Sequence, residues 1–131
     1  MNSFTFCWGQ GGYTIEAIVV KCGSDLNITI GGGNKYHIGA VAIAVPRFEY
    51  KENKKRTAST SLLCVYGHRE DELAYHVAKK IATSLDCIVS VSIGIHIDNI
   101  NNEEINILIN NVYKLMDTII EYFIKLRRKN E

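Results

Sequence analysis

The sequence predicts an α+β fold, with a mainly antiparallel sheet of five to six strands and two helices packed on one face. Short segments rich in β-branched residues fill the first half of the chain and are separated by glycine-rich turns. Two segments with the apolar spacing of helices follow, one before and one after a further strand-like segment. Early strands joined by short turns favour antiparallel pairing, and two helices can cover only one face of such a sheet.

Strands are expected at five places along the chain: 13–22, 26–30, 38–45, 59–66 and 88–97. Several glycines break the chain before the first of them, so residues 1–12 are expected to form a short strand or a loose arm. Three consecutive glycines open the segment 31–35, which is therefore expected to be a flexible turn.

The strand at 38–45 has one unusual face. Because side chains alternate along a strand, this face carries only Ala40, Ala42 and Ala44. A face of alanines would let a helix, a second subunit or a flat ligand approach the sheet closely. Pro46 is expected to end the strand, because it has no N–H for the ladder. The charge-dense segment 47–58 that follows is expected to be a mobile loop or an extended hairpin.

The first helix is expected at about 69–84, with core-facing residues at Leu73, Val77, Ile81 and Leu85. A second, longer helix is expected after Asn101, since Asn101 and Glu104 have the spacing of a capping box. Its apolar stripe extends to Leu126, and basic residues follow at its C-terminal end, where they suit the helix dipole.

Composition limits the classes of function. The chain has 131 residues, of which 47% are hydrophobic and 22% charged, with a net charge of +1. These values predict one globular domain spanning 1–131, and they favour neither nucleic acid nor a membrane surface as a partner. No long apolar run or leader-like pattern is visible, so a cytoplasmic location is expected. The cysteines lack the paired spacing of zinc sites. Three of them, Cys22, Cys64 and Cys87, are expected to be reduced and largely buried.

His96 and Asp98 form the first candidate site. They lie two residues apart at the end of the strand 88–97 and therefore point to the same side. A His-x-Asp pair can bind a divalent metal, or the aspartate can orient the imidazole ring. The alternative is a solvated strand end that leads into a turn.

A second candidate lies between a strand and a helix, at Gly67-His68. Free N–H groups at a helix start favour an anion, but Glu70 and Asp71 follow and would repel phosphate. A metal ion would resolve the conflict, since imidazoles and carboxylates could hold the cation while the cation holds a phosphate. Taken by itself, the position of His37 in the sequence is typical of an exposed residue at the start of a strand.

We expect His37, His68 and His96 to converge at one end of the sheet with Asp98 and an acid from Glu70 or Asp71. Each histidine lies at a strand end or beside a glycine, and none lies in an apolar stripe. The sequence shows no nucleophile elbow, Walker loop or H-E-x-x-H motif.

Four separated motifs resemble the LpdD-like prenylated-flavin chaperones, small accessory proteins of the UbiD-type decarboxylases. The motifs are the glycines at 32–33 with HIGAVAIAVPR at 37–47, Thr-Ser-x-Leu at 60–63, GHREDEL at 67–73 and GIHID at 94–98. The resemblance extends from about Tyr13 to Lys114.

The resemblance implies a homodimeric, non-enzymatic protein that binds prenylated FMN, or FMN, assists its oxidative maturation and passes it to a UbiD-type decarboxylase. It implies cofactor-binding residues in the matched motifs: His37, Gly39, Arg47, Ser61, Gly67, His68, His96 and Asp98. For a divalent metal, the candidates are His68, Glu70, Asp71, His96 and Asp98. Two other functions remain open: a small metal-dependent hydrolase or decarboxylase subunit, and a structural assembly partner without a ligand.

Overall fold

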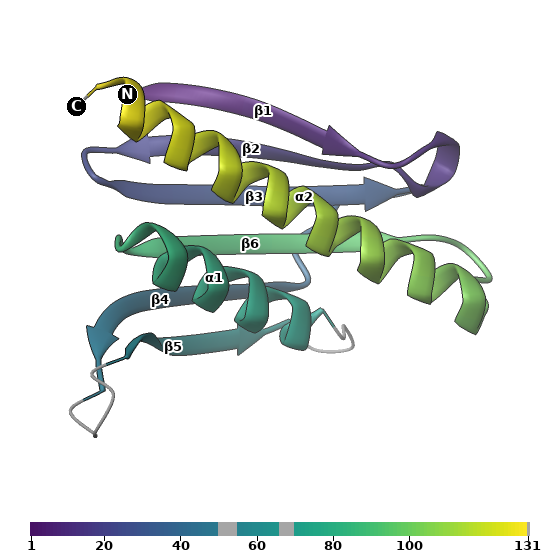
Figure 1. Ribbon diagram of the computed structural model, residues 1–131. Coiled ribbons are helices and arrows are strands. Elements are labelled where there is room, and N and C mark those ends of the chain that lie inside the picture. Colours follow the sequence, from purple (N-terminus) through teal and green to yellow (C-terminus); the bar gives the residue numbers. More distant parts are fainter. Residues whose placement is uncertain (50–54, 66–69, 131) are drawn as a thin grey trace.

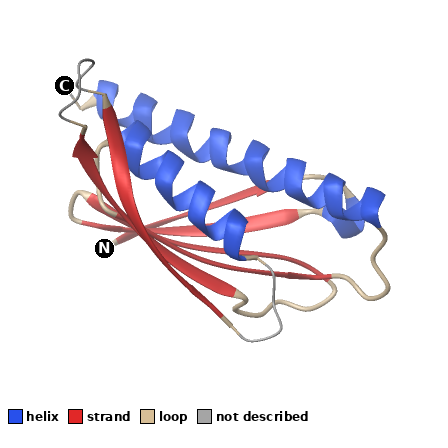
Figure 2. Cartoon of the chain, turned by 90° about the horizontal axis from the view of Figure 1, so that it is seen from below, coloured by secondary structure: helices blue, strands red, loops and turns tan. Residues whose placement is uncertain are grey.

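The computed structural model describes residues 1–49, 55–65 and 70–130. They form a six-stranded sheet in the order β1-β2-β3-β6-β4-β5, with both α-helices on one face (Figures 1 and 2). The strands are β1 (Asn2–Trp8), β2 (Ile15–Cys22), β3 (Asp25–Gly33), β4 (Ala40–Phe48), β5 (Arg56–Cys64) and β6 (Val89–His96). The helices are the short η1 (Gly11–Tyr13), α1 (Asp71–Leu85) and α2 (Asn102–Lys129). The prediction of an α+β fold is confirmed.

All neighbouring strands pair antiparallel except β3 and β6, which are parallel. Residues 34–39 join β3 to β4 and are called the linker 34–39. Because β6 lies between β3 and β4 in the sheet, this linker must cross β6. The crossing takes place at Gly94, where a Cβ would collide with the backbone oxygen of His37. Glycine is therefore required at this position of β6 for the linker to pass.

Two N-terminal expectations can now be decided. Residues 2–8 form β1, which pairs with β2 along its whole length, so the short strand is present and the loose arm is not. The expectation of a flexible turn at 31–35 is wrong for its first three residues. Gly31–Gly33 continue β3 and pair with Gly94, Ile95 and His96 of β6. The missing side chains leave room for neighbours that cross the sheet, such as the ring of Tyr36 beside Gly31.

The alanine face of β4 is part of the core. Ala40, Ala42 and Ala44 are at most 1% exposed and lie beneath α1, which packs over β4, β5 and β6 while α2 packs over β1 and β2 (Figure 1). The alanines therefore admit a helix, and they are not accessible to a flat ligand or a second subunit. The contact is close because α1 also presents small residues to the sheet, namely Ala74, Ala78 and Ala82.

No described residue of the helices covers the opposite face of the sheet (Figure 2). On β4 it carries Val41, Ile43 and Val45, which are 39%, 45% and 44% exposed. Leu63 of β5 lies opposite Val41 and is 79% exposed. This apolar group, Val41, Ile43, Val45 and Leu63, is called the open-face patch below.

Only part of the segment 47–58 lies between strands, so the loop is shorter than the sequence suggested. The prediction that Pro46 ends the strand is wrong, since β4 continues through Pro46 to Phe48. β5 begins at Arg56, so the two strands form an extended hairpin, one of the two expected forms. Pro46 is tolerated because β4 pairs with β6 only as far as Ala44, which leaves one side of the strand free at the proline. Residues 50–54 lie outside the described part of the chain.

The thiols differ from expectation. Cys87 is buried, as predicted, but Cys7, Cys22 and Cys64 are exposed. The prediction is wrong for Cys22 and Cys64 because Cys22 ends β2 on the uncovered face and Cys64 ends an edge strand. The capping box at Asn101 and Glu104 is present in both directions. Within the described residues, neither helix has the length and apolarity needed to cross a membrane.

Candidate functional site

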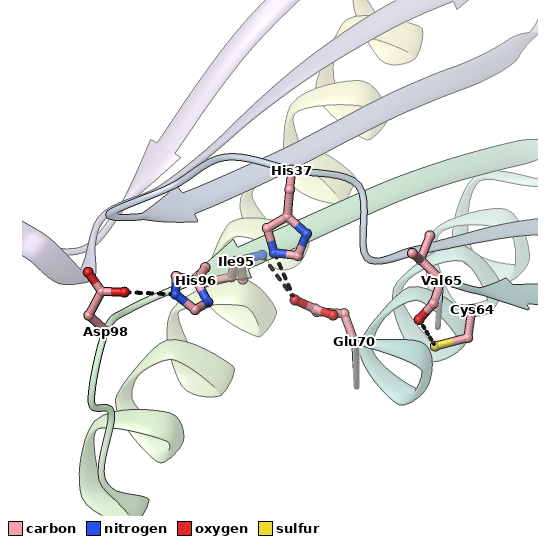
Figure 3. Close-up of polar contacts among 7 residues, drawn as sticks. All are labelled: His37, Cys64, Val65, Glu70, Ile95, His96 and Asp98. Atoms are coloured by element: carbon pink, nitrogen blue, oxygen red, sulfur yellow. Dashed lines mark hydrogen bonds and ion pairs between the residues drawn. The ribbon is translucent and has the colours of Figure 1, made fainter. Parts of the chain in front are cut away.

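One end of the sheet brings together four of the predicted site residues. His37 comes from the linker 34–39, Glu70 precedes α1, His96 ends β6 and Asp98 follows it. Figure 3 shows the ring of His37 facing the carboxylate of Glu70 and the ring of His96 turned toward Asp98. The ring centroids of the two histidines are 6.4 Å apart. Three separate segments of the chain therefore converge at this point.

Glu70 is the centre of the arrangement. Its Oε1 accepts a hydrogen bond of 3.3 Å from the backbone N–H of Ile95 and lies 3.3 Å from Nε2 of His37. β4 pairs with β6 only as far as Ala40 and Ile93, so Ile95 lies beyond the last residue of β6 that β4 pairs with. The carboxylate thus takes the place of a neighbouring strand at the end of β6.

Both side chains of this pair are largely buried: His37 is 15% exposed and Glu70 is 12% exposed. Oε2 of Glu70 is buried and accepts no hydrogen bond from the residues that the structure describes. A buried carboxylate oxygen without a donor is costly, since it loses water without replacement. The site therefore offers a strong acceptor to a ligand that carries an N–H or O–H group.

His96 and Asp98 form the exposed part of the site. Nε2 of His96 lies 2.9 Å from Oδ1 of Asp98, and the two side chains are 48% and 76% exposed. The backbone N–H of Asp98 donates to Oδ1 of Asn34 at 3.1 Å, which ties the end of β6 to the start of the linker. Of the two roles suggested by the His-x-Asp spacing, ring orientation matches this geometry.

An apolar cavity of about 310 Å³ opens beside Glu70 and His96. It lies between the end of β6, the start of α1 and the start of α2. Glu70 and His96 form its polar edge. The remaining lining is aliphatic: Leu73, Ile95, Ile97, Ile100, Ile105, Leu108 and Ile109. The polar motifs of the sequence gave no indication of this cavity. Its only signal was the surplus of isoleucine around the capping box, which a search for polar motifs does not detect.

The other predicted residues lie in different places. Gly39 is in the site, where its Cα lies against the carboxylate of Glu70. Arg47 is at the far end of β4, with its Nε donating to Oγ of Ser59 at 2.7 Å. Seven residues of strand, about 23 Å, separate it from Ala40. Ser61 is exposed in the middle of β5, opposite Ile43. Neither belongs to this cluster.

Gly67 and His68 lie outside the described residues, so the expected convergence is seen for two of its three histidines. Asp71 is the first residue of α1, directly after Glu70. Within 1–49, 55–65 and 70–130, no three His, Cys, Asp or Glu side chains are grouped to hold a metal ion. The described members of the predicted metal set, Glu70, Asp71, His96 and Asp98, therefore form no metal site by themselves, and His68 lies outside the described residues.

Comparison with known proteins shows what this chain is similar to. The family described as "Prenylated flavin chaperone LpdD-like domain" matches residues 9–124. Protein LpdD of Lactiplantibacillus plantarum is 30% identical over 105 residues, which cover 77% of this chain and 71% of that protein. A chaperone complex for yeast 20S proteasome assembly contains a similar fold, with a TM-score of 0.57 at 12% identity. That match covers 95% of this chain and 98% of the other, and at this identity it concerns the fold alone.

Proposed function

The chain belongs to the LpdD-like prenylated-flavin chaperone family, and we propose that it binds prenylated FMN and delivers it to a UbiD-type decarboxylase. It acts as a carrier that assists the maturation of the cofactor, and it does not itself catalyse decarboxylation. The observation that supports this best is the apolar cavity with Glu70 and His96 on its edge. Sites for flat organic cofactors are mostly apolar, with a few polar groups that fix the orientation.

The chemistry of the ring system matches this arrangement. A flavin is apolar over most of its rings, and prenylation adds a further aliphatic ring. Its pyrimidine edge carries an N–H donor between two carbonyl acceptors. Oε2 of Glu70 is available to accept from such a donor, and the ring of His96 lies beside it on the edge of the cavity. The cavity therefore takes the rings, and the polar edge sets their orientation.

The exposure of the polar edge agrees with a carrier. Nearly half of the His96 side chain and most of the Asp98 side chain are exposed to solvent. A ligand held at an exposed edge can leave without a large opening of the protein, and affinity differences between related sites lie mostly in the dissociation rate. The described residues form no metal-binding group, and the contacts proposed here involve no metal.

We also propose that the protein works as a homodimer, in which a second copy covers the open-face patch. Exposed apolar patches of this kind mark interaction surfaces in monomeric structures. Ile43 lies near the middle of β4 and Leu63 near the end of the adjoining β5, and a two-fold interface would bury them against the same residues of the other copy.

The test is retention of the cofactor after co-expression with a flavin prenyltransferase, read by absorbance and mass spectrometry. Wild type is compared with Ile105→Trp, which fills the cavity, and with Ile107→Trp as the control. Both isoleucines are on α2, and they are 38% and 37% exposed, but only Ile105 lines the cavity. We expect wild type and Ile107→Trp to retain the flavin and to activate an apo-decarboxylase, whereas Ile105→Trp should lose most of the bound flavin.

Two further variants test the polar residues. His96→Ala and His68→Ala should both reduce retention while the circular dichroism spectrum stays that of the wild type. Absence of flavin from the wild-type protein would contradict the proposed function. Equal retention by Ile105→Trp and Ile107→Trp would leave the function standing and remove the cavity from it.

A further inference from the structure

A second concave surface lies away from this site, beside the C-terminal half of α1. It is a groove of about 640 Å³ between the β4–β5 hairpin and the helices. The hairpin residues are Glu49 and 55–57, and α1 contributes His76, Lys79, Lys80 and Thr83. In Figure 2 the corresponding end of the sheet curves up beside the helix layer. The two sites are separate, because their linings share no described residue, and on α1 the nearest groove residue, His76, is about 9 Å of helix from Glu70.

Positive charge is concentrated in this groove. Among the residues that the structure describes, its lining has four cations, Lys55, Arg56, Lys79 and Lys80, and one carboxylate, that of Glu49. The whole chain has a net charge of only +1, so the excess of three positive charges in this lining (four minus one) leaves the rest of the chain net negative, and Asp86 beside Arg56 offsets part of that excess. Charge segregated in this way creates a local field that attracts an anionic partner.

The walls of the groove hold their positions through defined contacts. Nε of Arg56 donates to the backbone oxygen of Thr83 at 2.7 Å, and its Nη1 lies 3.5 Å from Asp86. These contacts fasten the start of β5 to the end of α1. Nζ of Lys79 lies 5.5 Å from the centre of the Tyr75 ring. The concave shape is therefore built by the fold. Tyr113 and Met116 of α2 add an apolar part to its lining.

The exposure of the cations indicates the kind of ligand. Lys55, Lys80 and His76 are exposed, and Arg56 and Lys79 are half-buried. A pocket for a small anion places buried, convergent donors around it, as bidentate arginine sites do. Exposed lysines around an apolar centre instead match the polar rim of a protein interface, where charge complementarity sets the association rate and the register.

We propose that this groove docks an acidic surface segment of a partner protein. Lys79 and Lys80 of α1 and Lys55, which directly precedes β5, face its carboxylates, and the half-buried Tyr113 contacts an apolar residue within the segment. Such a contact is weak and sensitive to salt, because exposed charge pairs contribute little individually and are screened. It is suited to an encounter that must form and dissociate repeatedly.

The experiment uses a fluorescein-labelled oligo-glutamate peptide as the probe and reads fluorescence anisotropy at low and moderate salt. The groove variant is Lys79→Glu with Lys80→Glu. Lys114→Glu with Lys125→Glu is the matched control, since both of these lysines are exposed on α2 and neither lines the groove. The two variants change the net charge equally. We expect a loss of affinity of about tenfold or more in the groove variant and within about threefold in the control.

Three outcomes would overturn the proposal. Equal weakening in both variants would show that only net charge matters. Failure of the wild type to bind the peptide at low salt would remove the docking surface, and displacement of the peptide by low-millimolar inorganic phosphate would make the groove a small-anion site. Flavin retention is measured on the same proteins and should be unchanged in the groove variant. The docking proposal can therefore fail while the proposed function stands, and the reverse also holds.

Discussion

The carboxylate of Glu70 lies directly against the Cα of Gly39, in the space that a Cβ at position 39 would occupy. Gly39 ends the linker that crosses β6, and Glu70 opens α1. The same carboxylate accepts a hydrogen bond from the N–H of Ile95 on β6. One glycine therefore allows a single acidic side chain to join β4, β6 and α1 at the edge of the cavity.

Gly39→Ala should disrupt this junction. The new methyl group would collide with Oε2 of Glu70 and force the carboxylate away from Ile95. Overpacking of this kind costs about 1–3 kcal/mol. We expect a decrease of that size in the free energy of unfolding, measured with urea. The control is Gly12→Ala, because a Cβ at Gly12 meets no atom within 4 Å. Equal stability of the two variants would show that the contact is not tight.

Glu70→Gln separates the structural role of Glu70 from its binding role. The amide oxygen can still accept from Ile95 N–H, but an NH₂ group replaces the buried acceptor Oε2. We expect the variant to fold and to bind flavin about tenfold more weakly or worse, since a ligand donor would then lack its acceptor. The control is Glu72→Gln, an exposed acid in the first turn of α1. Equal flavin affinity in the two variants would place Oε2 of Glu70 outside the ligand contact.

The pattern of the sequence predicted most of the fold because strand and helix periodicities depend on local burial. The class, the two helices, the capping box at Asn101 and the buried side of β6 all follow from it. The order of the strands in the sheet could not be predicted in the same way. Nothing local says that β6 is inserted between β3 and β4, so neither the crossing at Gly94 nor the role of Gly31–Gly33 in β3 could be derived.

The site, too, could be predicted only in part. The convergence of His37, His96, Asp98 and an acid could be predicted, since strand ends and helix starts meet at one edge of a layered fold. The alanine face of β4 was open to several interpretations, because alternation tells which residues share a face and not what covers that face. Arg47 was assigned to the site because it belongs to the same continuous sequence motif as His37. In the structure, the length of β4 separates Arg47 from the site.

The open-face patch predicts how the protein assembles. We expect wild type to sediment as a dimer at tens of micromolar and Ile43→Glu to sediment as a monomer, because a buried, unpaired carboxylate would oppose the interface. Ile107→Glu is the control: Ile107 is 37% exposed, comparable to Ile43 at 45%, but lies on α2. A monomeric wild type would contradict the homodimer. Dissociation of both variants would show that the interface is not confined to the sheet.

The thiols should differ strongly in reactivity. Cys64 is exposed and Cys87 is 4% exposed. Burial raises the pKa of the Cys87 thiol, with Asp25 and Asp86 adding to the shift and Arg127 opposing it. In native protein we expect a thiol reagent to label Cys64 rapidly and Cys87 only on unfolding, as mass spectrometry of timed samples would show. Equal rates would contradict the burial of Cys87.

The same shift has a consequence for pH dependence. Because the folded protein favours the neutral thiol of Cys87, its contribution to stability is complete below the ordinary thiol pKa and is lost as the pH rises through the raised pKa. Cys87→Ala should therefore lose less stability between neutral and strongly alkaline pH than the wild type does. Urea unfolding of both proteins across that range is the measurement, and parallel curves would contradict it.

The last prediction connects the start of α2 with the cavity. Oδ1 of Asn101 accepts from the N–H of Glu104 at 2.8 Å, and Glu104 Oε1 accepts in return from the N–H of Asn101 at 3.4 Å. This capping box holds the first turn of α2, which carries Ile105 into the cavity lining. Asn101→Ala should lower the free energy of unfolding by about 1 kcal/mol and should also speed the loss of bound flavin, since a frayed turn leaves the cavity wall loose. Asn106→Ala, at an exposed position of the same helix, is the control and should change neither quantity appreciably. Stopped-flow transfer of flavin to an apo-decarboxylase would measure the rate. A stability loss without faster release would show that the first turn of α2 is not part of the binding wall.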